Sequence, residues 1–196
     1  MLLGVTGNSG CGQTTFAFEL ARCGAEVCSL DRVGHRLLAR PSVARCLEEA
    51  LDLPGLSGEG LNRVRSRVGE AVFESPHRLE TLNSIVHPMM RRWAGVAAGR
   101  LRGRQGMYVL EGALILELGL ASLLDRLVVI EDTMQRCMRR AAARDGTSPD
   151  TVRARWRAQW SMDRKSAAAD FVVRNSGGEE ALRREARALY SRLQRM

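Results

Sequence analysis

The sequence has few of the features that mark a disulfide-rich, zinc-binding or membrane-spanning protein. Its five cysteines form no Cys-x-x-Cys pair, so we expect reduced thiols rather than a disulfide framework or a zinc site. They are Cys11, Cys23, Cys28, Cys46 and Cys137. No uninterrupted apolar run approaches membrane-spanning length, because Glu111, Glu117 and Asp125 interrupt the most apolar region. The first predicted strand begins at once and leaves no room for a signal peptide, so we expect a soluble cytoplasmic protein with no membrane partner.

Lysine and aromatic residues are also scarce. Lys165 is the one lysine among 30 basic residues, and aromatic residues make up only 5% of the chain. The formal net charge of +8 favours a polyanionic partner, such as nucleic acid, a nucleotide or another phosphorylated small molecule. No basic run carries interleaved aromatic residues, which disfavours nucleic acid. With 196 residues the chain suits one domain with small inserted subdomains.

The strongest motif is a glycine-rich loop at residues 7–15, Gly-Asn-Ser-Gly-Cys-Gly-Gln-Thr-Thr. An apolar run at 2–6, predicted to be a strand, precedes it, and a helical pattern of apolar residues follows it from Phe16. The loop fits the phosphate-binding pattern G-x-x-x-x-G-K-[ST] at every fixed position except Gln13, which stands where the lysine belongs. The sequence therefore predicts a nucleotide-binding loop without its charged side chain. A glycine-rich turn with no ligand is the alternative.

The residue types in this loop suit the binding of a nucleotide and magnesium. Bare backbone can approach phosphate oxygens closely, and the amides of the loop and of the following helix N-terminus supply partial positive charge. The hydroxyl of Thr14 stands where the motif places a magnesium ligand, and we expect Thr15 to contact a phosphate. The predicted nucleotide-binding residues of the loop are Gly10, Cys11, Gly12, Gln13, Thr14 and Thr15.

Acidic residues end two further predicted strands. Asp31 follows a strand expected at 25–30, and Glu111 follows one expected at 107–110. Ligands of open α/β sheets lie at the carboxyl ends of strands. Asp31 could accept a proton from a substrate hydroxyl or simply cap the next helix. Glu111 could contact magnesium, directly or through water, or be a solvated strand-end carboxylate.

The rest of the chain predicts a mainly helical insertion and two more strands. Residues 41–103 show amphipathic helical patterns and no strand, with His87-Pro88 predicted to interrupt one helix. A histidine at such a break is more often structural than catalytic. Residues 127–130 and 170–174 read as the fourth and fifth strands of a parallel sheet. We expect a short helix through 114–124 and a closing helix from 179 to about 194.

An arginine-rich helical hairpin follows the fourth predicted strand. Arg140 and Arg144 are four residues apart and share a helix face. A second helix, expected to open at Thr151, carries more arginines and ends with Lys165. Arginines on a closing lid neutralise phosphate charge in the transition state and exclude water. A solvated basic face is the alternative.

Together these segments make the chain resemble the dephospho-coenzyme A kinase family nearly end to end. The segments that carry the resemblance are 3–7, 30–35, 82–88, 114–117, Arg140 with 144–146, and 169–177. Among them, the Leu-Asn-x-x-x-His-Pro string at 82–88 is quite specific to that family. The loop alone indicates only a P-loop protein.

The resemblance implies an α/β fold of the P-loop nucleotide-kinase type, in which residues 1–196 form one kinase unit. A five-stranded parallel core would comprise residues 1–40, 104–143 and 170–196. A helical coenzyme A-binding insertion would span 41–103, and a helical lid 144–169. The implied reaction uses ATP and magnesium, and transfers the γ-phosphoryl group to the ribose 3′-hydroxyl of dephospho-coenzyme A. This is the last step of coenzyme A synthesis.

The resemblance also implies roles for single residues. Asp31 matches the family's general base and contacts substrate, and Arg140 and Arg144 match lid arginines that hold phosphates, Arg140 in a catalytic role. Asn175 lies in the loop beside the adenine, and His87 falls in the coenzyme A-binding region. Glu111 is assigned to the substrate side of the site.

Three departures from the family pattern bear on this interpretation. Gln13 replaces the lysine that bridges the β- and γ-phosphates, Ser29 replaces the first aspartate of an Asp-x-Asp pair, and Gly112-Ala113 replaces a Val-Pro. Three hypotheses follow: an active kinase whose missing charge is supplied by Arg140, a pseudokinase that only binds nucleotide or coenzyme A, and a kinase of another small alcohol. We expect a small-molecule substrate, no nucleic-acid partner, and a monomer or weak homo-oligomer.

Overall fold

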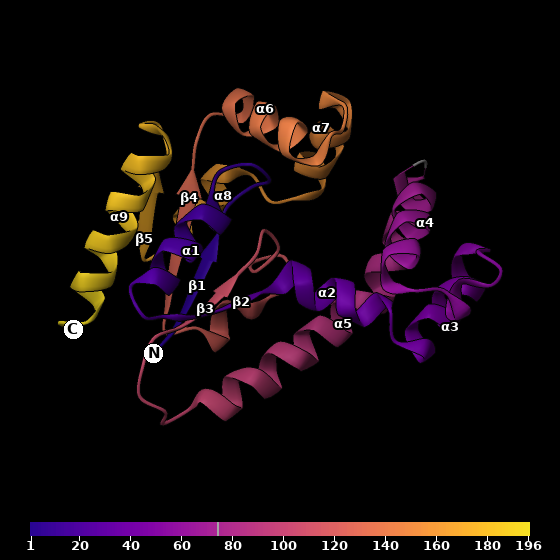
Figure 1. Cartoon of the computed structure of the whole chain (residues 1–196), viewed down its shortest axis with the longest axis horizontal. Coiled ribbons are helices and arrows are strands. Elements are labelled where there is room, and N and C mark those ends of the chain that lie inside the picture. The colour runs from indigo at the N-terminus through magenta and orange to yellow at the C-terminus, as the bar shows by residue number, and fades with distance from the viewer. Residues whose placement is uncertain (74) are drawn as a thin grey trace. The chain divides into compact units, whose positions relative to one another are not determined.

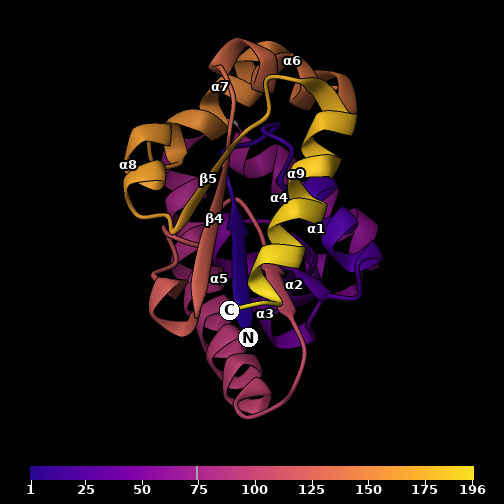
Figure 2. The same cartoon turned by 90° about the vertical axis from the view of Figure 1, so that its left-hand side faces the viewer.

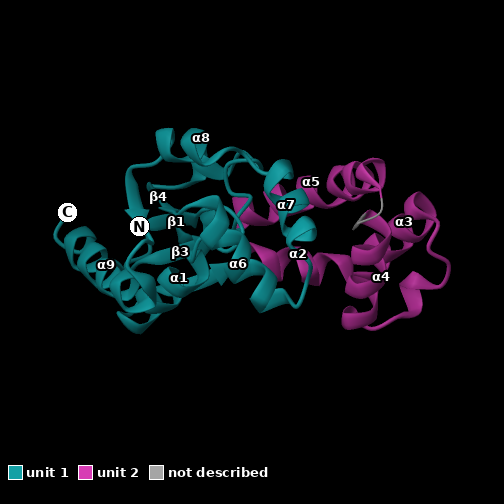
Figure 3. Cartoon of the chain, turned by 90° about the horizontal axis from the view of Figure 1, so that it is seen from above, with its two compact units in different colours: residues 1–29, 97–196 teal, residues 30–96 magenta. Residues whose placement is uncertain are grey.

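The computed structural model describes residues 1–73 and 75–196. These residues form two compact units, one of residues 1–29 with 97–196 and one of residues 30–96 (Figure 3). The roles predicted for core, insertion and lid stay predictions, and each unit is described by itself below. No helix among the described residues is both long enough and apolar enough to cross a membrane.

The first unit is built on one parallel sheet. Its strands are β1 (Leu2–Thr6), β2 (Glu26–Ser29), β3 (Tyr108–Glu111), β4 (Arg126–Glu131) and β5 (Phe171–Arg174). The order is β2-β3-β1-β4-β5, with Gly4 of the central strand opposite Leu110 on one side and Leu127 on the other. β1, β3 and β4 are apolar and largely buried, as strands covered on both faces must be. The predicted five-stranded parallel sheet is confirmed.

Two helices cover one face of this sheet, α1 (Gln13–Arg22) and α9 (Gly178–Leu193). Figures 1 and 2 show them side by side, and their apolar faces meet the strands in one core. That core includes Leu3, Val5, Phe16, Leu20, Val128, Ile130, Leu182, Ala186 and Leu189. The apolar residues of both helices recur three or four positions apart, so each helix presents a single stripe to the sheet. Glu19 of α1 ties the two helices together through Arg183 and Arg187 of α9.

The helices between β4 and β5 are α6 (Met134–Asp145), α7 (Pro149–Ala158) and α8 (Met162–Ala167). Of these, α6 and α7 lie beyond the carboxyl ends of the strands, and α8 lies beside β4 (Figure 2). The single helix expected from Thr151 to Lys165 was wrong, because Ser161 starts α8 as a new helix by accepting a hydrogen bond from the Arg164 amide. The helix expected at 114–124 was also wrong. Gly119 there adopts a φ of 66°, and only a 3₁₀ turn (η2, Leu120–Leu123) follows it.

The second unit is helical. Its elements are α2 (Leu30–Leu38), α3 (Pro41–Leu51), the 3₁₀ turn η1 (Leu56–Gly58), α4 (Leu61–Phe73) and all but the last turn of α5 (Pro76–Leu101). The predicted break at His87-Pro88 was wrong, since α5 runs through Pro88 without interruption. Pro88 and Ser84 are both exposed, so water can satisfy the Ser84 carbonyl that the proline leaves without an amide partner.

Candidate active site

The glycine-rich loop leaves the carboxyl end of β1 and leads into α1 (Figure 1). Gly10 and Gly12 have φ values of 84° and 106°, which side chains with a Cβ rarely adopt. A Cβ on Gly10 would collide with the backbone carbonyl of Cys137, and one on Gly12 would lie 2.6 Å from Asn175 Nδ2. Both glycines are therefore required by backbone angle and by close packing.

Side chains from α6 and from the end of β5 hold one side of this loop. Asn175 Nδ2 donates to the Cys11 carbonyl at 2.9 Å. The Arg140 guanidinium donates to the Gly10 carbonyl at 3.3 Å and to the Asn175 carbonyl at 3.3 Å. It also pairs with the carboxylate of Asp132, whose side chain is only 2% exposed. The structure thus brings together four residues that were predicted from the sequence: Gly10, Cys11, Arg140 and Asn175.

A second group of contacts comes from the last turn of α7 and the connection that follows it, residues 156–160. Trp156 Nε1 donates to the Ser9 carbonyl at 2.9 Å, and the Ser9 amide donates to Gln159 Oε1 at 3.2 Å. Asn8 Nδ2 donates to the Trp160 carbonyl at 3.3 Å. The sequence analysis did not predict these contacts of Trp156, Gln159 and Trp160. Each joins residues about 150 positions apart, and such a contact leaves no local sequence pattern.

The start of α1 has the electrostatics of a phosphate site. The first amides of a helix have no acceptor within the helix and carry partial positive charge. The first turn of α1 itself contains no acidic residue. Thr15 is half-buried in the same turn. With the glycine cradle before it, this helix end suits the phosphates of a nucleotide.

Gln13 is buried at this helix start, with 6% of its surface exposed. Its Oε1 is buried and accepts no hydrogen bond from any residue that the structure describes. Lys165 near the loop pairs with Glu117. Asp132 is shared by Arg140 and Arg136. The group of Asp132, Arg136 and Arg140 therefore keeps a net positive charge beside the loop.

Thr14 and Glu111 place two side-chain oxygen atoms next to each other in the candidate site. Thr14 Oγ1 donates to Glu111 Oε1 at 2.9 Å, and Glu111 is 3% exposed at the end of β3. No group of three or more His, Cys, Asp or Glu side chains suited to a metal occurs within residues 1–73 and 75–196. Magnesium in kinase sites needs no such group, because one or two protein oxygens act together with phosphate oxygens and water. Thr14 and Glu111 fit that donor set.

The remaining predicted residues lie elsewhere in the two units. Arg144, in the last turn of α6, pairs with Asp145 at 2.7 Å, and hydrogen bonds from Arg144 and from Arg155 lower the pKa of the Asp145 carboxyl. Asp31 is the exposed second residue of α2, and His87 is half-buried in α5. Both belong to the second unit, whereas the loop belongs to the first.

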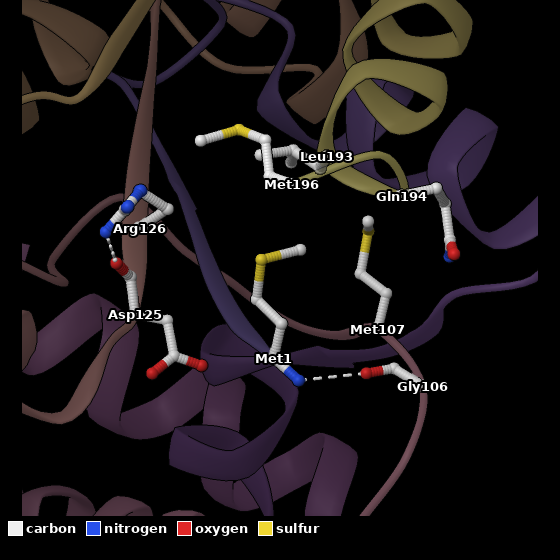
Figure 4. Close-up of a pocket in the computed structure, with 8 residues that line it drawn as sticks. All are labelled: Met1, Gly106, Met107, Asp125, Arg126, Leu193, Gln194 and Met196. Atoms are coloured by element: carbon white, nitrogen blue, oxygen red, sulfur yellow. Dashed lines mark hydrogen bonds between the residues drawn. The ribbon is translucent and has the colours of Figure 1, made fainter.

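A separate hollow lies at the opposite, amino end of the sheet. Figure 4 shows it lined by Met1, Met107, Leu193 and Met196, with the Met1 amino group donating to the Gly106 carbonyl at 2.9 Å. Ligands of parallel sheets bind at the carboxyl ends of the strands, where the loop lies. We therefore assign the candidate active site to the loop and not to this hollow.

Comparison with known proteins identifies the group to which the chain belongs. It is 32% identical over 195 residues to a dephospho-CoA kinase of Chlorobium luteolum, covering 97% of this chain and 89% of the relative. It is 36% identical over 198 residues to a dephospho-CoA kinase of Methylococcus capsulatus, covering 98% of this chain and 96% of the relative. A solved dephospho-CoA kinase from Campylobacter jejuni has the same fold, with a TM-score of 0.65 at 22% identity, covering 97% of this chain and 96% of that one. A model of the dephospho-CoA kinase family matches residues 1–180, and the chain belongs to that family.

Proposed function

We propose that this protein is a dephospho-coenzyme A kinase, which transfers the γ-phosphoryl group of ATP to the ribose 3′-hydroxyl of dephospho-coenzyme A. The observation that carries the proposal is the intact geometry of the loop. Its glycine cradle leads into α1, and the Thr14 hydroxyl lies 2.9 Å from Glu111. This arrangement suits phosphates and magnesium together, as phosphoryl transfer requires.

The residues of the first unit would hold the nucleotide. The amides of the loop and of the first turn of α1 would bind phosphate oxygens, and Asn175 would lie beside the adenine. Thr14 and Glu111 would hold magnesium, which neutralises phosphate charge. The Arg140 side chain keeps 38% of its surface exposed, so its guanidinium could also contact a phosphate. Arg144, which is 57% exposed, is proposed for the same task.

Asp31 is the proposed general base, and His87 is assigned to the coenzyme A side. Asp31 comes two residues after β2, whose carboxyl end shares the loop's edge of the sheet. Its carboxylate would take the proton of the 3′-hydroxyl as that oxygen attacks the γ-phosphorus. Replacing Asp31 with Asn should lower kcat about a hundredfold or more while ATP affinity stays the same. A loss of thermal stability without a loss of kcat would indicate a helix cap instead.

Gln13 supports a second candidate, a pseudokinase that binds nucleotide or coenzyme A without turnover. Its amide can donate hydrogen bonds to a phosphate but brings no charge. Loss of a comparable transition-state contact costs on the order of 3 kcal/mol, about a hundredfold in rate. Ser29, in place of a further aspartate, removes a second charge near the strand end.

A coupled assay with purified protein, ATP, magnesium and dephospho-coenzyme A distinguishes the two candidates. Turnover above that of an Asp31→Ala control supports the kinase. Binding of ATP or coenzyme A by calorimetry, without turnover, supports the pseudokinase. Activity with another small alcohol and none with dephospho-coenzyme A would redirect the proposal to a different substrate.

Replacing Gln13 with Lys would restore the charge of the motif. We expect kcat to rise about a hundredfold if that charge is the missing element, since one transition-state contact is worth this much. A Gln13→Met variant of similar length is the matched control and should give no gain. Equal kcat in the wild-type and Lys variants would mean that the charge is not limiting.

The same proposal includes a cytoplasmic location and a monomer or weak homo-oligomer. The chain covers 89% and 96% of the two relatives described above, and no part of the proposed reaction requires a second copy of the chain. Gel filtration with light scattering at micromolar concentration tests the oligomeric state. A stable dimer at this concentration would contradict the proposed monomer or weak homo-oligomer.

A further inference from the structure

Two cysteine thiols meet directly beneath the phosphate-binding loop. Cys11 Sγ and Cys137 Sγ are 2.7 Å apart, and both residues are completely buried. Cys11 lies in the loop between its two left-handed glycines, and Cys137 lies in the first turn of α6. A disulfide bond is about 2.05 Å long, so closing it needs only a small approach of the two sulfurs.

The two thiols are not equivalent. The hydrogen bond from Cys137 lowers the pKa of Cys11 despite its burial, and the same contact raises the pKa of Cys137. When Cys11 is ionised, the Cys137 thiol donates the hydrogen bond between the two sulfurs. Thiolates near a helix N-terminus are the reactive form of cysteine, and Cys11 comes two residues before the start of α1.

We propose that Cys11 and Cys137 form a redox pair that closes an intramolecular disulfide and locks the phosphate-binding loop against α6. The oxidant is a peroxide, which reaches these buried sulfurs only when the loop opens. The Cys11 thiolate attacks one peroxide oxygen, the O–O bond breaks, and a sulfenic acid and hydroxide form. The sulfur of Cys137 then displaces the sulfenic oxygen as water and leaves the disulfide. Two thiols and one hydrogen peroxide thus give one disulfide and two waters, and a dithiol reverses the step.

The lock would act on nucleotide binding. In the present conformation two loop amides are already used, since Ser9 donates to Gln159 Oε1 at 3.2 Å and Cys11 donates to the Asn8 carbonyl at 3.0 Å. A phosphate that takes either of these two amides must displace the acceptor that the amide has now, and this requires a local shift of the backbone at Ser9 or Cys11. A covalent bond from Cys11 to α6 opposes that change. This part of the inference rests on the nucleotide binding in the proposed function.

The test treats the full-length wild-type protein with hydrogen peroxide and compares it with protein kept in dithiothreitol. Peptide mapping by mass spectrometry without reduction should find Cys11 joined to Cys137. Calorimetry should show about tenfold weaker ATP binding, equivalent to about 1.4 kcal/mol, that dithiothreitol restores. Peptide mapping does not depend on ATP binding, so failure of the disulfide and failure of the proposed function give different results.

Matched variants separate this pair from the other cysteines. Cys137→Ser and Cys137→Ala should remove the peroxide effect on ATP binding, whereas Cys46→Ser, at an exposed position on α3, should retain it. Two variants at Cys137 are used because one of them could fail to fold. The inference is overturned if peroxide oxidises Cys46 but leaves Cys11 and Cys137 reduced. It is also overturned if the disulfide forms and ATP binding does not change.

Discussion

Lys165 offers the sharpest test of how the region around the loop is held together. Its side chain is completely buried, and its ammonium donates to the Ala113 carbonyl at 2.6 Å and pairs with Glu117 at 3.0 Å. Glu117 in turn accepts from the Trp160 amide at 2.8 Å. We expect Lys165→Met to destabilise the protein, because the methionine fills the space but leaves two buried acceptors behind.

The loss of stability in the Lys165→Met variant depends on the contacts that Glu117 keeps. Removing one partner of a buried ion pair costs about 3–5 kcal/mol. Glu117 keeps the Trp160 hydrogen bond and 11% exposure, so we expect the lower end, about 3 kcal/mol. For a chain of this size that loss lowers Tm by about 6–12 °C.

The double variant Lys165→Met with Glu117→Leu should behave differently. Burial lowers the pKa of Lys165 although Glu117 acts to raise it, so desolvation outweighs the attraction of the pair. Removing both charges should therefore restore most of the stability or exceed it. Together with Glu117→Leu alone, the variants form a double-mutant cycle, measured by urea unfolding at pH 7.

Arg153→Met is the control for this cycle. Arg153 pairs with Asp150 at 4.0 Å on the surface, and the change should cost less than about 1 kcal/mol. The reasoning fails if Lys165→Met costs no more than this control. It also fails if the double variant is as unstable as the sum of the two single ones.

Two further predictions concern the site and the contact between α1 and α9. Thr14→Val removes the hydroxyl next to Glu111 and should raise the magnesium concentration for half-maximal activity, while an unchanged magnesium titration would contradict the assignment. For Glu19, the hydrogen bonds from Arg187 and then Arg183 lower its pKa below the ordinary 4.5, so the folded state releases this proton more readily than the unfolded state. The stabilisation is complete above the unfolded pKa and is lost as pH falls through the folded one. The Tm difference between wild type and Glu19→Gln should therefore shrink between pH 7 and pH 3, and a constant difference would refute the pairing.

Sequence reasoning predicted the elements whose signal is local. The apolar runs of β1, β3 and β4 and the glycine pattern of the loop each lie within a few neighbouring residues, and the structure places them as expected. The positions of Pro88 and Lys165 needed information from distant residues. Pro88 favours a helix break, but its exposed position in α5 tolerates it. Lys165 ends a strongly basic stretch, yet it is completely buried. Its ammonium pairs with Glu117 and donates a hydrogen bond to the Ala113 carbonyl, and these contacts make the burial possible.

The sequence predicted which residues could form the candidate site, but it did not predict the contacts that hold the loop in place. Thr14 was expected in the loop after the first strand and Glu111 at the end of the third, and the sheet brings them together because parallel strands share one carboxyl edge. The Cys11–Cys137 contact and the contacts of residues 156–160 were not predicted. Each depends on how helices after β4 return over the loop, and hydrophobic periodicity does not specify that path.

The long sequence separation of the loop's supports has a consequence for protein synthesis. The loop precedes its partners Glu111, Arg140, Trp156 and Asn175 by 97 to 164 positions, so it leaves the ribosome before they do. Contacts at such separation form late, because the chain between them must first be made and closed. A nascent chain that ends before Glu111 would carry the complete motif without any of these four contacts, and one that ends before Asn175 would lack the hydrogen bond to the Cys11 carbonyl. We therefore expect nucleotide to stabilise the complete chain more than chains that end before these partners.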